Sequence, residues 1–209
     1  MTIIIIFLLV GIGILFFSLG VSMYFFNSTF KRKDTKAAFG IRLFIVLPLL
    51  VVFSCSNKVE LSCPQDIAEK AFYFAEEYET LGSEYGWGVQ DPLPRSIKVD
   101  CSGLVVRCYE YALENTPYGL PFIDASSTAM YTTYSYPTTL EKLRKGDLLF
   151  MGDSESAKVS HIALFEKLEN DKINFIDSTQ KDDINGVTRR SYSKDDKRFK
   201  AFGVMKLIY

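Results

Sequence analysis

Apolar residues are concentrated at the amino-terminal end of the chain. Residues 3–26 carry no charged side chain, and a helix of about 20 apolar residues is long enough to cross a bilayer. A second apolar run at residues 43–53 is too short to span a bilayer comfortably, but it suits the central region of a signal peptide. We therefore predict a transmembrane segment within residues 1–30 and a signal-like segment within residues 31–55. The basic stretch between the two runs contains Lys31, Arg32, Lys33 and Lys36.

The second apolar run ends at Ser54 and Cys55. An apolar run followed by a small residue and a cysteine resembles the lipobox of bacterial lipoproteins, in which the cysteine is lipidated and becomes the mature amino terminus. The resemblance implies lipidation of Cys55, and an ordinary cysteine in an apolar segment is the alternative. Because lipoprotein signals begin near the start of a chain, two interpretations remain: two separate hydrophobic segments, or translation from Met23. Both keep the basic stretch in the cytoplasm by the positive-inside rule, and both put the residues after Cys55 outside it.

The rest of the chain has the pattern of one globular domain that begins with amphipathic helices. Residues 56–63 are polar and are interpreted as a linker, and residues 64–209 are interpreted as the domain. Apolar residues at helical spacing predict one helix over residues 64–81, which Gly82 ends, and a second helix over residues 102–113.

Strand patterns dominate the second half of this domain. Two segments, residues 86–99 and 115–137, contain the glycine, proline and small polar residues that are typical of loops. Because helices precede a series of strands, we predict an α+β fold in which the helices pack on an antiparallel sheet. The predicted strands are residues 147–150, 161–165, 173–176 and 202–208.

Composition argues against some classes of function. The 24 basic and 25 acidic residues give a net charge of -1, so the charge gives no reason to expect a nucleic acid partner. The four cysteines include no CxxC pair, which argues against a thiolate zinc site, and we expect no cofactor. Whether Cys63 and Cys108 form a disulfide outside the cytoplasm is left open by the sequence. The chain has one histidine, so any chemistry that needs an imidazole must use His161.

One cysteine, one histidine and one aspartate lie where a cysteine nucleophile and its base are expected. Cys101 stands at the start of the second predicted helix, and a helix amino terminus with a neighbouring imidazolium favours a thiolate. His161 begins a predicted strand, which would hold a general base in a rigid frame, and Asp177 follows the neighbouring strand and can orient the imidazole. The alternatives are a buried core thiol for Cys101, a plain strand residue for His161 and a turn-forming residue for Asp177.

Residues 100–105 read DCSGLV and closely resemble the signature of the NlpC-type peptidases, a papain-like family of bacterial cell-wall hydrolases. The resemblance extends in motif order over about residues 64–209. It departs from the family pattern in several places. Val89 follows Gly88 where the family has a second glycine, residues 153–159 form a longer insert than is typical, and residues 115–137 are interpreted as an enlarged segment. The third catalytic residue of the family is usually histidine and sometimes asparagine, glutamine or aspartate, and the residue at that position here is Asp177. The other similar segments are YGWG at residues 85–88, LRKGDLLF at 143–150, SHIAL at 160–164, FIDS at 175–178 and FGVMKLIY at 202–209.

The resemblance implies a papain-like fold and an enzyme that cuts the stem peptides of peptidoglycan. The usual bond joins γ-D-glutamate to a diamino acid, often meso-diaminopimelate. The resemblance assigns Cys101 as nucleophile, His161 as base and Asp177, by position, as the third catalytic residue. It also implies that the backbone N–H of Cys101 helps to form the oxyanion hole.

The same resemblance implies contacts to the substrate. Tyr85, Asp100 and Ser102 match positions that in some members recognise the free amine of the stem's L-alanine, and Trp87 in the same region is interpreted as loop packing. Two other functions remain as alternatives: an amidase or thioesterase acting on another envelope or host substrate, and a non-catalytic envelope-binding scaffold. We expect a membrane-anchored protein whose catalytic domain lies outside the cytoplasm, with peptidoglycan and the membrane as its partners.

Overall fold

The computed structural model describes residues 58–94, 97–181 and 183–209. The hydrophobic segments that we predict within residues 1–55, including Cys55, lie outside this part of the chain. No helix among the described residues is long and apolar enough to cross a membrane. The residues Lys58–Tyr209 form one compact unit.

The described helices lie before β5, and from β5 onward the described elements are all strands. The described helices are α3 (Gln65–Thr80), α4 (Cys101–Leu113), α5 (Ser127–Thr132) and a 3-10 turn at Leu140–Lys142. The described strands are β1 (Glu60–Ser62), β2 (Glu84–Tyr85), β3 (Lys98–Val99), β4 (Ser135–Thr138), β5 (Leu148–Met151), β6 (His161–Glu169), β7 (Lys172–Lys181), β8 (Ile184–Ser193) and β9 (Phe199–Ile208).

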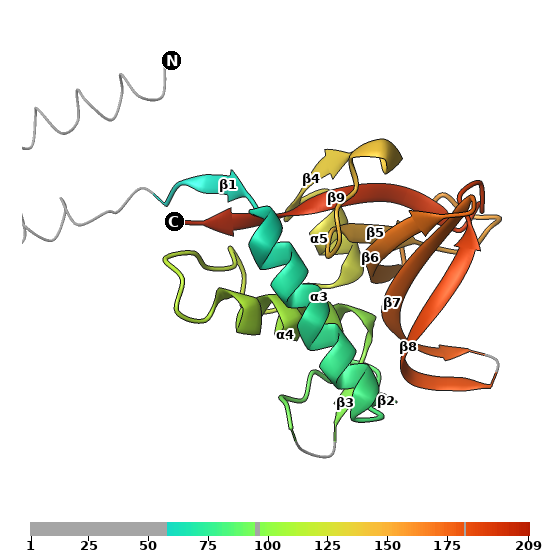
Figure 1. Cartoon of the computed structure of the whole chain (residues 1–209), viewed down its shortest axis with the longest axis horizontal. Coiled ribbons are helices and arrows are strands. Elements are labelled where there is room, and N and C mark those ends of the chain that lie inside the picture. Colours follow the sequence, from blue (N-terminus) through green and yellow to red (C-terminus); the bar gives the residue numbers. More distant parts are fainter. Residues whose placement is uncertain (1–57, 95–96, 182) are drawn as a thin grey trace, which may run out of the picture. The chain divides into compact units, whose positions relative to one another are not determined.

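An antiparallel sheet lies on one side of the unit, with α3 and α4 packed beside it (Figure 1). Seven of the described strands join in the order β1-β9-β5-β6-β7-β8, with β4 paired to β9 beside this series. β2 and β3 form a separate parallel pair near the end of α3 (Figure 1). The predicted combination of helices with an antiparallel sheet is therefore confirmed.

The first predicted helix is α3, and it differs from the prediction by one residue at each end. Its apolar stripe, which includes Phe72 and Tyr78, is buried against α4 and the sheet. The hydroxyl of Tyr78 donates a hydrogen bond to the carbonyl of Asp91 at 2.7 Å, so the burial of this side chain leaves no polar atom without a partner. Gly82 follows the helix with φ +66, a conformation that glycine adopts at no steric cost.

The strand β5 is buried on both faces, which explains its continuous apolar sequence. Leu148 and Phe150 belong to the main core beneath the helices. Leu149 and Met151 belong to a second core on the opposite face of the sheet. Aromatic side chains close this second core, and they include Phe175, Tyr192, Phe199 and Phe202.

The turn that leads into β5 brings the sheet close to α3. Gly146 has φ +90, and a Cβ atom there would lie 1.9 Å from the carbonyl oxygen of Ala68. Asp147 is buried, accepts a hydrogen bond from the backbone N–H of Arg144 at 2.8 Å and pairs with the Arg144 guanidinium at 3.3 Å. The glycine and aspartate of the LRKGDLLF segment therefore have structural tasks at this turn.

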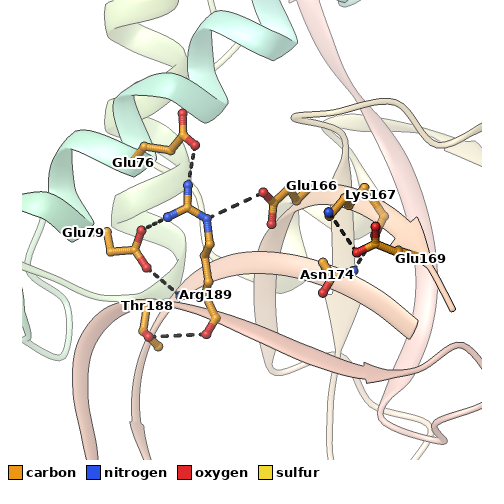
Figure 2. A network of polar contacts seen from close by, with 8 residues as sticks. All are labelled: Glu76, Glu79, Glu166, Lys167, Glu169, Asn174, Thr188 and Arg189. Atoms are coloured by element: carbon orange, nitrogen blue, oxygen red, sulfur yellow. Dashed lines mark hydrogen bonds and ion pairs between the residues drawn. The ribbon is translucent and has the colours of Figure 1, made fainter. Parts of the chain in front are cut away.

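Arg189 joins β8 to α3 and β6 (Figure 2). Its guanidinium pairs with Glu76 and Glu79 of α3, and its Nε lies 3.7 Å from Oε1 of Glu166. The Arg189 side chain is 40% exposed, so these pairs stabilise the domain only modestly. Successive residues of a strand face opposite sides of the sheet, and so the neighbouring Arg190 points away from α3.

The structure differs from the sequence prediction in several segments. The predicted loop at residues 86–99 ends in β3. The predicted surface loop at residues 115–137 contains α5 and most of β4, because Ser126 caps α5 by accepting a hydrogen bond from the N–H of Ala129 at 3.2 Å and β4 pairs with β9. The predicted linker at residues 56–63 contains β1, which also pairs with β9. The third predicted strand extends to Lys181 as β7, and β8 was not predicted.

Candidate active site

Asp100 sets the position of Cys101 at the first turn of α4. Its Oδ1 accepts hydrogen bonds from the backbone N–H of Gly103 at 2.6 Å and from the hydroxyl of Ser102 at 2.9 Å. Its Oδ2 accepts a third hydrogen bond from the N–H of Gly88 at 2.9 Å. This N-cap begins the helix at Cys101, where the helix dipole favours negative charge on a side chain.

A close approach between the loop at residues 86–90 and α4 forms one wall of the site. A Cβ atom at Gly103 would lie 2.6 Å from the carbonyl oxygen of Val89, so only glycine lets the loop lie this close. Trp87, at the tip of the loop, is 86% exposed. The interpretation of Trp87 as loop packing is therefore wrong, because the loop is held by its backbone and by Asp100 rather than by this side chain.

His161 and Asp177 lie next to each other on paired strands. His161 is the first residue of β6, and Asp177 lies in the middle of β7. The Nε2 of His161 is 2.5 Å from the Oδ2 of Asp177. The carboxylate accepts the Nε2–H, which leaves Nδ1 as the ring nitrogen available to Cys101. Asp177 therefore reaches His161, as the sequence predicted. The Asp177 side chain is fully buried against the imidazole.

Arg190 is a part of the site that the sequence analysis missed. Its Nε donates to Oδ1 of Asp177 at 3.0 Å, and its Nη2 donates to Oδ2 of the same carboxylate. Its Nη1 donates to the hydroxyl of Tyr192 at 2.6 Å. The two oxygens of Asp177 are therefore shared between His161 and a guanidinium that is only 11% exposed.

A single buried hydrogen bond ties the strand of Asp177 to the segment before Cys101. The hydroxyl of Ser178 donates to the carbonyl of Val99 at 2.6 Å, and both residues are buried. Because Ser178 follows Asp177 and Val99 lies two residues before Cys101, this bond fixes the distance between the sheet and the start of α4.

The surroundings of His161 favour its protonated form. Burial alone would lower the pKa of His161, but the hydrogen bond and charge of Asp177, with the nearby Cys101, outweigh burial and raise the pKa to about 9. An imidazolium at neutral pH can pair with a thiolate and can later donate a proton. The arrangement is therefore suited to nucleophilic catalysis by Cys101.

The other two described cysteines have a different environment. Cys63 and Cys108 are free and buried, so the disulfide that the sequence left open is not formed. Burial raises the pKa of the Cys63 thiol to about 12 and holds the pKa of Cys108 well above its usual range. Neither is suited to act as a thiolate at neutral pH.

Two cavities meet beside the cysteine and histidine, and Ser160 lines both. The first has a volume of about 250 Å³ and is lined by Cys101, Asp100 and the exposed Trp87, among others. The second has a volume of about 410 Å³ and is lined by His161 and the ends of β7 and β8. A substrate that lies across both cavities would pass the thiol and the imidazole in turn.

The three predicted substrate-binding residues lie around the first cavity or next to it. Asp100 and Ser102 line the cavity, and Tyr85 lies on β2, opposite Val99 of β3. Burial raises the pKa of Tyr85, and the proximity of Cys101 and Asp100 raises it further. Asp100 already accepts three hydrogen bonds, and a carboxylate has about four acceptor positions, so one is left for a ligand.

Within the described ranges, no group of three or more histidine, cysteine, aspartate or glutamate side chains could hold a metal ion.

A thiol at the start of a helix, next to a histidine that a buried aspartate holds on an antiparallel sheet, is the arrangement of the papain-like cysteine hydrolases. The family model of NlpC/P60 matches residues 82–200, which is more than half of the chain. The chain belongs to the NlpC/P60 family, whose members are typically cell-wall peptidases and amidases.

Several solved structures are similar to this chain at low sequence identity. NlpC1 from Trichomonas vaginalis is 18% identical with a TM-score of 0.48, over 70% of this chain and 46% of that protein. A lipoprotein-like NLP/P60 protein from Staphylococcus aureus is 19% identical with a TM-score of 0.48, over 74% of this chain and 46% of that protein. Ly7917, also solved with the hydrolysis product of MDP, is 13% identical with TM-scores of 0.42 and 0.41, over 68% of this chain and 61% of that protein.

This chain spans just under half of the length of the first two of these proteins. No curated protein matches the sequence.

The shared carboxylate of Asp177 yields a stability prediction. Arg190→Met removes two hydrogen bonds from a fully buried carboxylate, and breaking a buried pair in this way costs about 3–5 kcal/mol. We expect urea unfolding to show a loss in this range. Asp177→Asn/Arg190→Met should lose less free energy of unfolding than the sum of the two single variants, because it removes the carboxylate and the guanidinium that pair with each other together.

Arg189→Met is the matched control, since it removes the neighbouring arginine, whose ion pairs lie at the surface, and should cost no more than about 1 kcal/mol. Equal losses for Arg189→Met and Arg190→Met would contradict this account of the buried pair.

Proposed function

We propose that Cys101, His161 and Asp177 are the catalytic residues of a cysteine endopeptidase that hydrolyses the stem peptides of peptidoglycan. The observation that carries the proposal is the position of the imidazole, which lies between the thiol of Cys101 and the buried carboxylate of Asp177. The family supports the substrate class, because NlpC/P60 members typically act on the cell wall.

In the first half of the reaction, the Cys101 thiolate attacks the carbonyl carbon of the scissile amide. The negative charge moves to the carbonyl oxygen, where the backbone N–H of Cys101 at the helix start stabilises it. The His161 imidazolium then donates its proton to the leaving nitrogen as the C–N bond breaks. The amine leaves, and the acyl group remains on the sulfur as a thioester.

In the second half, neutral His161 takes a proton from water, and the resulting hydroxide attacks the thioester carbonyl carbon. The C–S bond breaks, the product leaves as a carboxylic acid, and the Cys101 thiolate and His161 imidazolium return. Asp177 transfers no proton in this scheme. Its task is to hold the ring and to stabilise the imidazolium.

We further propose the bond between γ-D-glutamate and a diamino acid as the point of cleavage. Support comes from the DCSGLV resemblance at residues 100–105 and from the free acceptor position of Asp100 beside the first cavity. An ammonium group bound there would suit a stem with a free L-alanine amine, with Tyr85 and Ser102 nearby.

The proposed substrate lies outside the cytoplasm, and the proposal therefore includes an extracytoplasmic, membrane-anchored domain. The basic stretch at residues 31–36 between the two apolar runs supports this location, as does the lipobox-like sequence at Cys55.

Digestion of purified muropeptides by the full chain, analysed by mass spectrometry, tests the function directly. Wild type should release fragments cut after γ-D-glutamate. Cys101→Ala and His161→Ala should each abolish this release while the circular dichroism spectrum stays that of the folded protein, because no other histidine can act as base. Near wild-type turnover of Cys101→Ala would refute the proposal.

Asp177→Ala should lose roughly ten- to thousand-fold in kcat, less than His161→Ala, since an orienting group assists the base without replacing it.

Reporter fusions test the location. Alkaline phosphatase fused after Tyr209 should be active in cells, because alkaline phosphatase folds productively only outside the cytoplasm. A cytoplasmic reporter at the same place should be inactive. The reverse pattern would contradict an extracytoplasmic domain.

A further inference from the structure

The second cavity, on the His161 side of the site, carries an inference about the substrate, which rests on the proposed function. Its walls are the segment at residues 151–154, Ser160 and His161 at the start of β6, the end of β7, two residues of β8 and Arg198. At about 410 Å³ it has room for an amino acid side chain. The cationic groups that line it are His161 when protonated, Lys181, Arg190 and Arg198.

The two arginines are held in place by the same tyrosine. Arg190 donates a hydrogen bond to the hydroxyl of Tyr192 at 2.6 Å, and the guanidinium of Arg198 lies 3.5 Å from the centre of the Tyr192 ring. A guanidinium stacked on an aromatic ring is ordered before a ligand arrives, so less conformational entropy is lost on binding.

The arginines differ in what they can offer to a ligand. Arg190 uses its Nε and Nη2 on Asp177 and its Nη1 on Tyr192, and it is nearly buried. Arg198 uses Nε and Nη2 on Asp196 and is 32% exposed, which leaves its Nη1 available. Among the arginine and lysine side chains that line this cavity, Arg198 and the exposed Lys181 therefore have donors available for a ligand.

The charges on the two sides of the site have opposite sign. The second cavity has one carboxylate in its wall, Asp153, and two more behind the arginines, Asp177 and Asp196, against four cationic groups when His161 is protonated. Among the described residues that line the first cavity, Asp100 and Asp124 are acidic and none is basic.

The catalytic scheme fixes which part of the substrate enters each cavity. The acyl group binds to the sulfur of Cys101 and so occupies the first cavity. The leaving nitrogen receives its proton from His161, and the residue that carries this nitrogen enters the second cavity.

We propose that the second cavity is a binding site for a side-chain carboxylate of the leaving diamino acid, held by Arg198 and Lys181. The enzyme then prefers a diamino acid with a free side-chain carboxylate over one whose side chain ends in an amine or an amide.

Three synthetic stem peptides with amidated carboxyl termini test the preference with the full chain. They share L-alanyl-γ-D-glutamate and differ in the third residue, which is meso-diaminopimelate, its side-chain amide or L-lysine. We expect kcat/KM for the free acid to exceed the other two by roughly tenfold or more, the range of a charge-assisted hydrogen bond. Arg198→Gln and Lys181→Gln should each reduce this preference, and Arg198→Lys should retain part of it.

Lys197→Gln is the matched control, because it removes a positive charge from the residue before Arg198 without removing a group that lines the cavity. It should leave the preference unchanged. Equal kcat/KM values for the acid, the amide and lysine would overturn the inference while the proposed function stands, as would an unchanged preference in both Arg198→Gln and Lys181→Gln.

Calorimetric binding of the same peptides to the full chain with Cys101→Ala separates the two proposals. Tighter binding of the free acid that Arg198→Gln abolishes supports the cavity assignment even if no peptide is cleaved, in which case only the proposed function fails. Binding of all three peptides with equal affinity, or binding of none, overturns the cavity assignment.

Discussion

The carboxylate of Asp177 has no exposed surface, and a buried charge of this kind must be matched by groups that pair with it and donate hydrogen bonds. His161 and Arg190 provide them from the strands on either side. The pairing register of β6, β7 and β8 must therefore bring His161 and Arg190 to Asp177. The same requirement holds the imidazole at the start of β6, where Cys101 lies close enough to raise its pKa.

Cys101 is held in place by a second set of polar contacts. Asp100 starts α4 at Cys101, and Ser178 ties the strand of Asp177 to Val99. The thiol and the imidazole thus come from separate elements whose relative position depends on one buried hydrogen bond and on the packing of α4 against the sheet. Cys63 and Cys108 lie in the same core but have no such surroundings, which is why one of the three described cysteines stands out chemically.

Much of the fold could be predicted because its elements follow simple periodicity. α3 and α4 each have one apolar stripe, and β5 is a continuous apolar run. β8 was missed because its inward positions hold Arg190 and Tyr192 in place of aliphatic residues, so no apolar alternation marks it.

Only part of the site could be predicted from the sequence. Cys101, His161 and Asp177 could be named because a helix start, a strand start and a strand end are visible in the sequence. Arg190 could not, because its contact with Asp177 depends on the register of β7 and β8, with Asp177 opposite Thr188. The exposure of Trp87 was also out of reach, since it depends on how the backbone of its loop is held by Asp100.

The central claim is that the buried carboxylate of Asp177 holds His161 as an imidazolium next to Cys101. Because His161 is the only histidine of the chain, its ring gives a single set of NMR signals, and their titration measures its pKa without assignment. We expect a pKa of about 9 in the wild type and a lower value in Asp177→Asn. Since the folded-state pKa is raised, this contact stabilises the fold below about pH 6.5, and its contribution is lost as the pH rises through about 9. A wild-type titration at or below about pH 6.5, unchanged by Asp177→Asn, would contradict the account.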